Sequence, residues 1–172
     1  SFVGVGETKA ENLVAWDGSH WLDPWKGHPL RGGISDLIVF QGALVACGNF
    51  VNADGQTVYY IARWNGSNWL PFDGGLSYSA FTMAVFNGEL VTGGAFITAS
   101  GNIVNRIARW DGSNWQPLGS GFDDIVYKLR VYNGRLIACG NFTTAGGNPA
   151  LRIAAWDGNS WSTLGGGLNA RV

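Results

Sequence analysis

The sequence predicts an all-β protein built from repeated four-stranded antiparallel units, and two observations support this prediction. One nine-residue pattern occurs four times, as LVAWDGSHW (13–21), IARWNGSNW (61–69), IARWDGSNW (107–115) and IAAWDGNSW (153–161). The first tryptophans of these copies are 48, 46 and 46 residues apart, a period typical of repeat architectures. In addition, 27 glycines and 9 tryptophans in 172 residues favour many short strands joined by tight turns.

Each unit is expected to contain four strands, which are clearest in the last copy. KLRVYNG (128–134) turns into RLIACGNF (135–142), and a glycine-rich loop (143–150) leads to LRIAAWDG (151–158) and NSWSTLG (159–165). Asn-Gly dipeptides at 87–88 and 133–134 favour tight hairpin turns, so the first two strands should be antiparallel neighbours. The Trp-Asp-Gly stretch joins the last two strands, and its Asp and Ser side chains can cap turn amides.

The predicted strands are apolar on both faces. In LRVY, Leu129 and Val131 point to one side and Tyr132 points to the other. Such strands belong to a small sheet that packs between two similar sheets. Four-stranded sheets repeated around an axis are the blades of a β-propeller, and the chain has length for about 3.75 of them.

The repeat also predicts the boundaries of the blades. Blade 1 covers residues 1–27, blade 2 covers 28–75, blade 3 covers 76–121, blade 4 covers 122–167, and 168–172 begin the next connection. SFVGVG (1–6) aligns with a second strand, so blade 1 is expected to lack its inner strand. A propeller commonly closes when one chain end supplies the strand that another blade lacks. We therefore expect more chain, or self-association as a dimer of half-rings, to complete the ring.

The repeats resemble the kelch motif. An apolar strand ending in Gly-Gly, LVTGGAF (90–96), precedes an aromatic-Asp turn and a tryptophan, RWDGSNW (109–115). They are most similar to the Trp-Asp-Gly kelch-like repeats of secreted and cell-surface bacterial proteins, which implies an extracellular or cell-surface location. Kelch-like propellers include sugar-processing enzymes and protein-binding scaffolds, so the fold alone does not assign a function. The hairpin departs from the Asp-box of sialidases, because Asp111 and Gly112 precede Ser113.

Composition argues against several classes of partner and cofactor. A formal net charge of −1 and 13% charged residues provide no basic face for nucleic acid. No apolar run approaches the roughly 20 residues that span a bilayer, so membrane insertion is not expected. Cys47 and Cys139 occupy one repeat position two units apart, and we expect small buried residues and no disulfide. No Cys-His pair has metal-ligand spacing, so neither a metal nor a cofactor is predicted.

Residues that recur in every copy serve the blade, so a ligand site should lie where the copies differ. The most divergent segments are the connections between blades, on the face of a propeller that usually binds ligands. The candidate ligand-binding residues in these connections are Trp25, Lys26, His28, Arg31, Asp73, Tyr78, Asp123 and Asp124. Aromatic rings flanked by hydrogen-bonding groups suit a saccharide or a peptide.

The sequence therefore predicts a non-enzymatic binding propeller that recognises a glycan, as a lectin does, or a protein. One alternative is a carbohydrate-active enzyme that uses loop carboxylates such as Asp73 and Asp123 as acid and base. Another alternative is a structural or engineered unit that assembles with its own copies, since few loop residues depart from the repeat.

Overall fold

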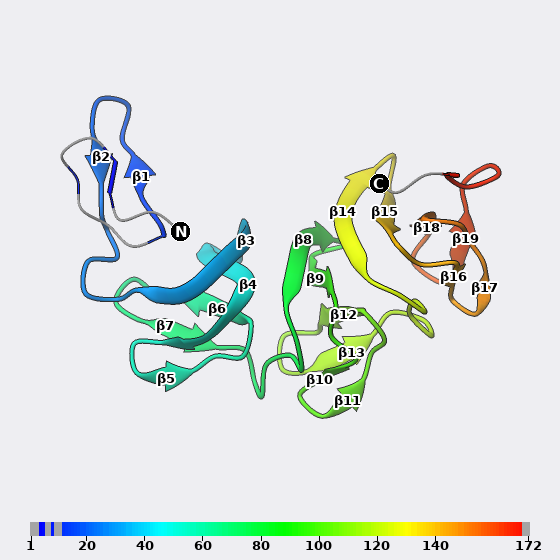
Figure 1. Ribbon diagram of the computed structural model, residues 1–172, viewed down its shortest axis with the longest axis horizontal. Coiled ribbons are helices and arrows are strands. Elements are labelled where there is room, and N and C mark those ends of the chain that lie inside the picture. Colours follow the sequence, from blue (N-terminus) through cyan, green and yellow to red (C-terminus); the bar gives the residue numbers. More distant parts are fainter. Residues whose placement is uncertain (1–3, 6–7, 9–11, 170–172) are drawn as a thin grey trace.

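The computed structural model describes residues 4, 5, 8 and 12–169, and this part of the chain forms strands, turns and loops without a helix. Three successive antiparallel sheets follow one another along an arc (Figure 1). The result confirms the predicted all-β class with blade-like four-stranded sheets. No helix with the length and hydropathy of a membrane span is present in the described residues.

The strands of each blade pair in the order expected for a propeller blade. Blade 2 contains β3 (Leu30–Phe40), β4 (Ala43–Ala53), β6 (Ile61–Trp64) and β7 (Trp69–Pro71), with β5 (Gln56–Thr57) paired to β4. Blade 3 contains β8 (Ala80–Phe86), β9 (Glu89–Gly94), β12 (Ile107–Trp110) and β13 (Trp115–Pro117). Blade 4 contains β14 (Val126–Tyr132), β15 (Arg135–Gly140), β18 (Ile153–Trp156) and β19 (Trp161–Thr163).

Two short hairpins and part of blade 1 complete the described chain. The hairpin of β10 (Thr98–Ala99) and β11 (Asn102–Ile103) belongs to blade 3, and that of β16 (Thr144–Ala145) and β17 (Asn148–Pro149) belongs to blade 4. In blade 1 only β1 (Ala15–Trp16) and β2 (Trp21–Leu22) form a sheet. The strand predicted at 1–6 lies largely outside the described residues.

The Trp-Asp-Gly turn has the same construction in all four copies. Its two tryptophans are directly opposite each other, as Trp110 and Trp115 are, with ring centroids 5.3 Å apart. The Asp111 carboxylate accepts hydrogen bonds from the backbone N–H groups of Ser113 (2.9 Å) and Asn114 (2.8 Å). Asn65 makes the equivalent bonds in the second copy with its amide oxygen, so the capping role predicted for the Asp position is confirmed. The Ser19 hydroxyl of the first copy instead donates to Asp17 Oδ1 at 2.9 Å.

The apolar core lies between the blades. One cluster joins Phe40, Val45 and Phe72 of blade 2 to Trp110 and Trp115 of blade 3, and a second cluster joins blades 3 and 4 in the same way. The first strands of the blades, β3, β8 and β14, lie side by side near the inside of the arc (Figure 1). Packing between blades, rather than within one sheet, therefore provides most of the burial.

Side chains of the first strands also link neighbouring blades by hydrogen bonds. The Asp36 carboxylate of blade 2 accepts a bond from the backbone N–H of Met83 in blade 3, at 2.8 Å. The Thr82 hydroxyl of blade 3 accepts the equivalent bond from the N–H of Leu129 in blade 4, at 3.1 Å. These hydrogen bonds hold the first strands of neighbouring blades in a fixed position relative to each other.

The cysteines are unpaired, as predicted. Cys47 is fully buried, and burial raises the pKa of its thiol far above the ordinary value. Cys139 is only partly buried, which corrects the expectation of two buried cysteines. The difference arises because Cys47 is covered by blade 3, whereas Cys139 lies on the outer face of the last blade.

The buried tryptophans allow a test of one hydrogen bond between blades. Trp161 donates from Nε1 to the carbonyl oxygen of Leu118 at 2.9 Å, whereas the buried Nε1 of Trp115 has no acceptor among the described residues. We expect Trp161→Phe to reduce the free energy of unfolding by about 1 kcal/mol more than Trp115→Phe, because only the former loses a bond. Denaturant unfolding of the two variants measures the difference, and equal losses would contradict the assignment.

Candidate functional site

The segments that connect blade 2 to blade 3 and blade 3 to blade 4 are held by the same backbone hydrogen bonds. The N–H of Leu76 donates to the carbonyl oxygen of Tyr59 at 3.0 Å, and the N–H of Phe122 donates to that of Asn105, also at 3.0 Å. On the other side, Ser100 donates from its N–H to the carbonyl oxygen of Gly75 at 2.9 Å. Each connection is thus clamped between a loop of the preceding blade and a hairpin of the following blade.

A pocket lies beside each of the three described connections. The pocket at blades 1 and 2 has a volume of about 260 Å³, that at blades 2 and 3 about 270 Å³, and that at blades 3 and 4 about 390 Å³. Residues 46 positions apart line the last two pockets, as Tyr59 and Asn105 do. The backbone of the pocket is therefore repeated, while the side chains on its rim differ.

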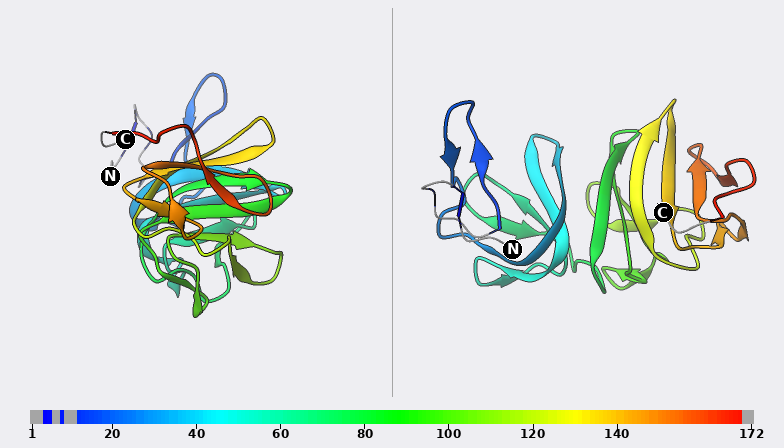
Figure 2. Two further views of the ribbon diagram at one scale, coloured as in Figure 1. Left: turned by 90° about the vertical axis from the view of Figure 1, so that its right-hand side faces the viewer. Right: turned by 45° about the horizontal axis from the view of Figure 1, so that its top comes forward.

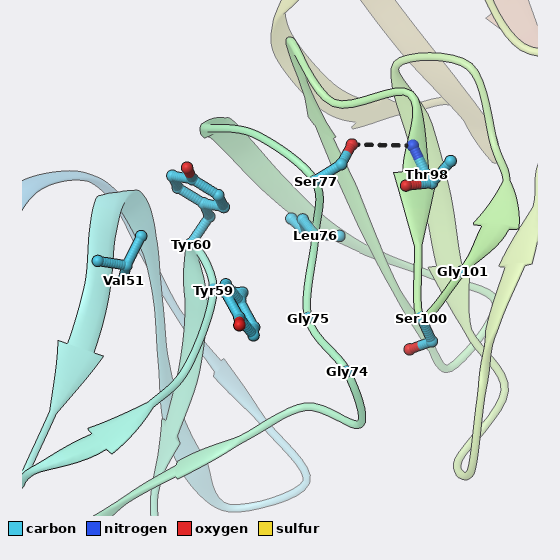
Figure 3. Close-up of a pocket in the computed structure, with 10 residues that line it drawn as sticks. All are labelled: Val51, Tyr59, Tyr60, Gly74, Gly75, Leu76, Ser77, Thr98, Ser100 and Gly101. Carbon is cyan, nitrogen blue, oxygen red and sulfur yellow. Dashed lines mark hydrogen bonds between the residues drawn. The ribbon is translucent and has the colours of Figure 1, made fainter.

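The pocket between blades 2 and 3, here called the tyrosine pocket, is lined by two adjacent tyrosines. Tyr59 and Tyr60 lie on one side of the connecting segment, and Thr98 and Ser100 of blade 3 lie on the other (Figure 3). None of the residues that line this pocket carries a formal charge at neutral pH. The Ser77 hydroxyl oxygen accepts bonds from the N–H groups of Ile97 (3.1 Å) and Thr98 (3.0 Å), which leaves its proton available to a ligand.

The two tyrosines adopt a backbone conformation that is unfavourable for their residue type. Their φ values are 41° for Tyr59 and 73° for Tyr60, in the left-handed region that costs roughly 1–2 kcal/mol per residue. Asn105 and Arg106, at the equivalent positions of blade 3, have φ values of 48° and 70°. In blade 4 only the second position keeps a positive φ, at Arg152 (62°). The conformation therefore recurs at both positions in blades 2 and 3, and in blade 2 the two residues are aromatic.

Tyr78, a residue predicted from the sequence, extends the aromatic rim. Its side chain is 58% exposed, and its ring centroid is 6.0 Å from that of Tyr60 at an interplanar angle of 33°. Tyr59 is 48% exposed. Tyr59 and Tyr60 therefore line one uncharged, hydroxyl-rich pocket, and Tyr78, from a separate segment, lies against Tyr60 beside it.

At blades 3 and 4, Asp123 occupies the position of Ser77. Its carboxylate accepts bonds from the N–H groups of Thr143 (2.9 Å) and Thr144 (2.8 Å) and from the Thr143 hydroxyl (2.5 Å). Partial burial opposes ionisation, but these hydrogen bonds outweigh it and hold the pKa of Asp123 below its usual value. Asp123 therefore serves the start of the β16–β17 hairpin as an ionised cap.

The residues predicted in the first connection have mainly internal contacts. The His28 ring nitrogen Nδ1 lies 2.9 Å from the Asp54 carboxylate, whose other oxygen accepts the N–H of Trp69 at 2.7 Å. Trp25 is partly buried against the core between blades 1 and 2. Lys26 is exposed, and only Arg31 lines the pocket at this junction.

The remaining predicted residues also differ in role. The side chain of Asp73 is exposed, while its carbonyl oxygen accepts a bond from the Ser100 hydroxyl. Asp124 accepts the N–H of the next residue, Ile125, at 2.7 Å. The eight predicted residues are thus distributed over three junctions and do not form one site.

Sequence reasoning missed Tyr59 and Tyr60. Comparison of the repeats contains a signal for them, because blade 2 has Tyr-Tyr where blade 3 has Asn-Arg and blade 4 has Leu-Arg. Tyr59 and Tyr60 lie in a loop within blade 2, whereas the residues predicted from the sequence lie in the connections between blades. No group of three or more potential metal-ligating side chains occurs within the described portion of the chain.

No protein-family model and no curated protein matches this sequence. The kelch-like relationship therefore stays a prediction from the repeat pattern.

The capping role of Asp123 can be tested by replacing it with alanine or with serine. Serine is the residue at the equivalent repeat position, Ser77. Asp123→Ala should reduce the free energy of unfolding by about 1 kcal/mol at neutral pH, because two N–H groups lose their acceptor. Asp123→Ser should lose less, since Ser77 accepts the equivalent pair of N–H groups.

The pH dependence of this effect has a definite sign. Because the pKa of Asp123 is lower in the folded chain, its contribution is complete above the unfolded pKa and is lost as the pH falls through the folded pKa. Thermal unfolding between neutral and acidic pH should show the wild type converging on Asp123→Ala. A stability difference that stays constant over that range would contradict the ionised cap.

Proposed function

We propose that this chain is a non-enzymatic recognition module that binds a neutral saccharide at the tyrosine pocket between blades 2 and 3. The single observation that carries the proposal is an uncharged pocket lined by Tyr59 and Tyr60, with the exposed ring of Tyr78 beside Tyr60. The exposed rings of Tyr59 and Tyr78 supply flat apolar surface at little cost in side-chain entropy.

The polar groups of the pocket suit the same ligand class. A sugar ring presents apolar C–H faces together with hydroxyl groups that both donate and accept hydrogen bonds. The tyrosine rings can contact the C–H faces, while the Ser77 hydroxyl and the tyrosine hydroxyls can pair with sugar hydroxyls. An uncharged pocket gives no particular advantage to a phosphate or a carboxylate. An extracellular or cell-surface location, implied by the kelch-like resemblance, would fit this ligand class.

The hydrolytic alternative receives less support from the carboxylates. A general acid must hold its proton near neutral pH, so its pKa is usually raised. The pKa of Asp123 is shifted in the opposite direction, and all three of its hydrogen bonds are committed to Thr143 and Thr144. For these reasons we favour binding without turnover.

Titration with a panel of neutral oligosaccharides, followed by calorimetry on those that bind, tests the proposal. Tyr59→Ala and Tyr78→Ala should each weaken binding roughly ten-fold, the factor that corresponds to about 1.4 kcal/mol of lost contact. Ile103→Ala is the matched control, because Ile103 is 69% exposed on β11 and does not line the pocket. It should leave the affinity unchanged.

Two results would contradict this function. One is a saccharide affinity that neither tyrosine variant alters while both variants remain folded by circular dichroism. The other is a panel without any binding oligosaccharide, which would favour a protein ligand. Turnover of a bound saccharide that Asp123→Asn abolishes would instead support the enzyme alternative.

A further inference from the structure

On the face of blade 4 that points away from blade 3, large apolar side chains occupy positions whose equivalents in blade 2 are buried. In blade 2 the residues that face blade 3 include Phe40 and Phe72, which are 7% and 3% exposed. The repeat places Tyr132 and Leu164 at the same positions of blade 4. Tyr132 is 68% exposed, and no described residue of the chain covers this side of the sheet in the way blade 3 covers Phe40.

This open face contains a broad apolar hollow. Its volume is about 720 Å³; Tyr132, Ile137 and Leu164 contribute its apolar lining, and Arg130 and Arg135 also line it. Ile137 occupies the position of Val91, which is 1% exposed in the core between blades 3 and 4. The open face of blade 4 thus carries apolar side chains at positions that are buried at the internal junctions, together with Arg130 and Arg135.

The partner of these positions at each internal junction is the tryptophan pair of the following blade. The Phe72 ring lies 5.2 Å from that of Trp110 and 5.7 Å from that of Trp115, centroid to centroid. At the next junction, Leu118 belongs to one core cluster with Trp156 and Trp161. A residue at the position of Leu164 is therefore expected to meet a tryptophan pair.

The glycine that follows this position shows the same relationship. At Gly119 a Cβ would lie 3.2 Å from an atom of Trp156 and 3.3 Å from an atom of Trp161, so the ring pair packs directly on the backbone. Gly165 has nearly the same φ, 57° compared with 66°. Nothing among the described residues lies within 4 Å of a Cβ built on Gly165.

Blade 1 carries a tryptophan pair that has no such partner among the described residues. Trp16 and Trp21 are 53% and 41% exposed, whereas every tryptophan in the equivalent positions of blades 3 and 4 is at most 8% exposed. Their rings still pair at 5.3 Å, as in the other copies. They lie in the β1–β2 hairpin, at the end of the arc opposite β19 (Figures 1 and 2).

We infer that a second copy of this chain docks head to tail. The side chains of its Trp16 and Trp21 pack on Leu164 and Gly165 of the first copy. These two surfaces are equivalent to those that pack against each other between blades 2 and 3 and between blades 3 and 4. Because they lie at opposite ends of one arc, a single copy does not join them (Figure 1). Two copies related by a two-fold axis can form both junctions and close a ring. This inference does not depend on the saccharide proposal.

The native mass of the purified chain, measured by light scattering over a concentration series, is the first test. We expect a species of about twice the chain mass of 18.4 kDa. Leu164→Arg should raise the dissociation constant at least about 30-fold, as removal of a central interface contact does. Trp16→Ala combined with Trp21→Ala should have the same effect. Ile103→Arg, at an exposed site on blade 3, is the control and should leave the mass unchanged.

A mixing experiment tests the head-to-tail geometry. Each disrupted variant alone should be monomeric, but an equimolar mixture of Leu164→Arg with the double tryptophan variant retains one intact junction. The mixture should therefore form a mixed dimer that neither variant forms by itself. A monomeric wild-type chain at tens of micromolar, a dimer unaffected by these variants, or a mixture without mixed dimers would each overturn the inference.

Discussion

The close contact between the connecting segment and the preceding blade, at the junctions of blades 2 and 3 and of blades 3 and 4, is the constraint on which the rest of the structure depends. A Cβ on Gly75 would lie 2.4 Å from Cβ of Tyr59, and a Cβ on Gly121 would lie 2.4 Å from the carbonyl oxygen of Asn105. Both glycines have positive φ, 63° and 75°, so glycine is required for conformation and for space. This contact places the next blade and its tryptophan pair against the core of the preceding blade.

Because backbone atoms make this contact, the side chains around it are free to differ between junctions. Ser77 and Asp123 occupy one repeat position in two pockets of the same construction, and Arg31 occupies that position in the pocket at blades 1 and 2. Ser77 and Asp123 both accept the first N–H groups of a following hairpin, so one structural task is compatible with a neutral or a charged group. Variation at such positions is therefore compatible with one fold.

Much of the fold was predictable from the sequence because its signals are local and repeated. In the Trp-Asp-Gly turn, one side-chain acceptor caps the N–H groups of the residues two and three positions after it, as Asp111 does for Ser113 and Asn114. All four copies have an Asp or Asn at this position. The candidate pockets were less predictable, since they form between segments distant in the chain. His28 seemed available as a ligand contact from its loop alone, but it pairs with Asp54, 26 residues away.

Tyr59 and Tyr60 were missed because the tyrosine pocket also forms between segments that are distant in the chain. Tyr59 and Tyr60 belong to a loop inside blade 2, and their relation to Ser77 and Thr98 exists only once blade 3 has docked. Tyr78 was predicted because it lies in a connection, where the copies differ most. Repeat comparison identifies variable positions, but the three-dimensional junction determines which of them share a pocket.

Residue-resolved oxidation by hydroxyl radicals, read by mass spectrometry in dilute and concentrated protein, tests the junction account most directly. The account predicts that Trp16, Trp21 and Leu164 become protected together as concentration rises, while exposed Tyr78 and Ile103 are oxidised equally at both concentrations. Oxidation of Trp16, Trp21 and Leu164 that does not change with concentration would contradict the claim that these residues form the two halves of one junction.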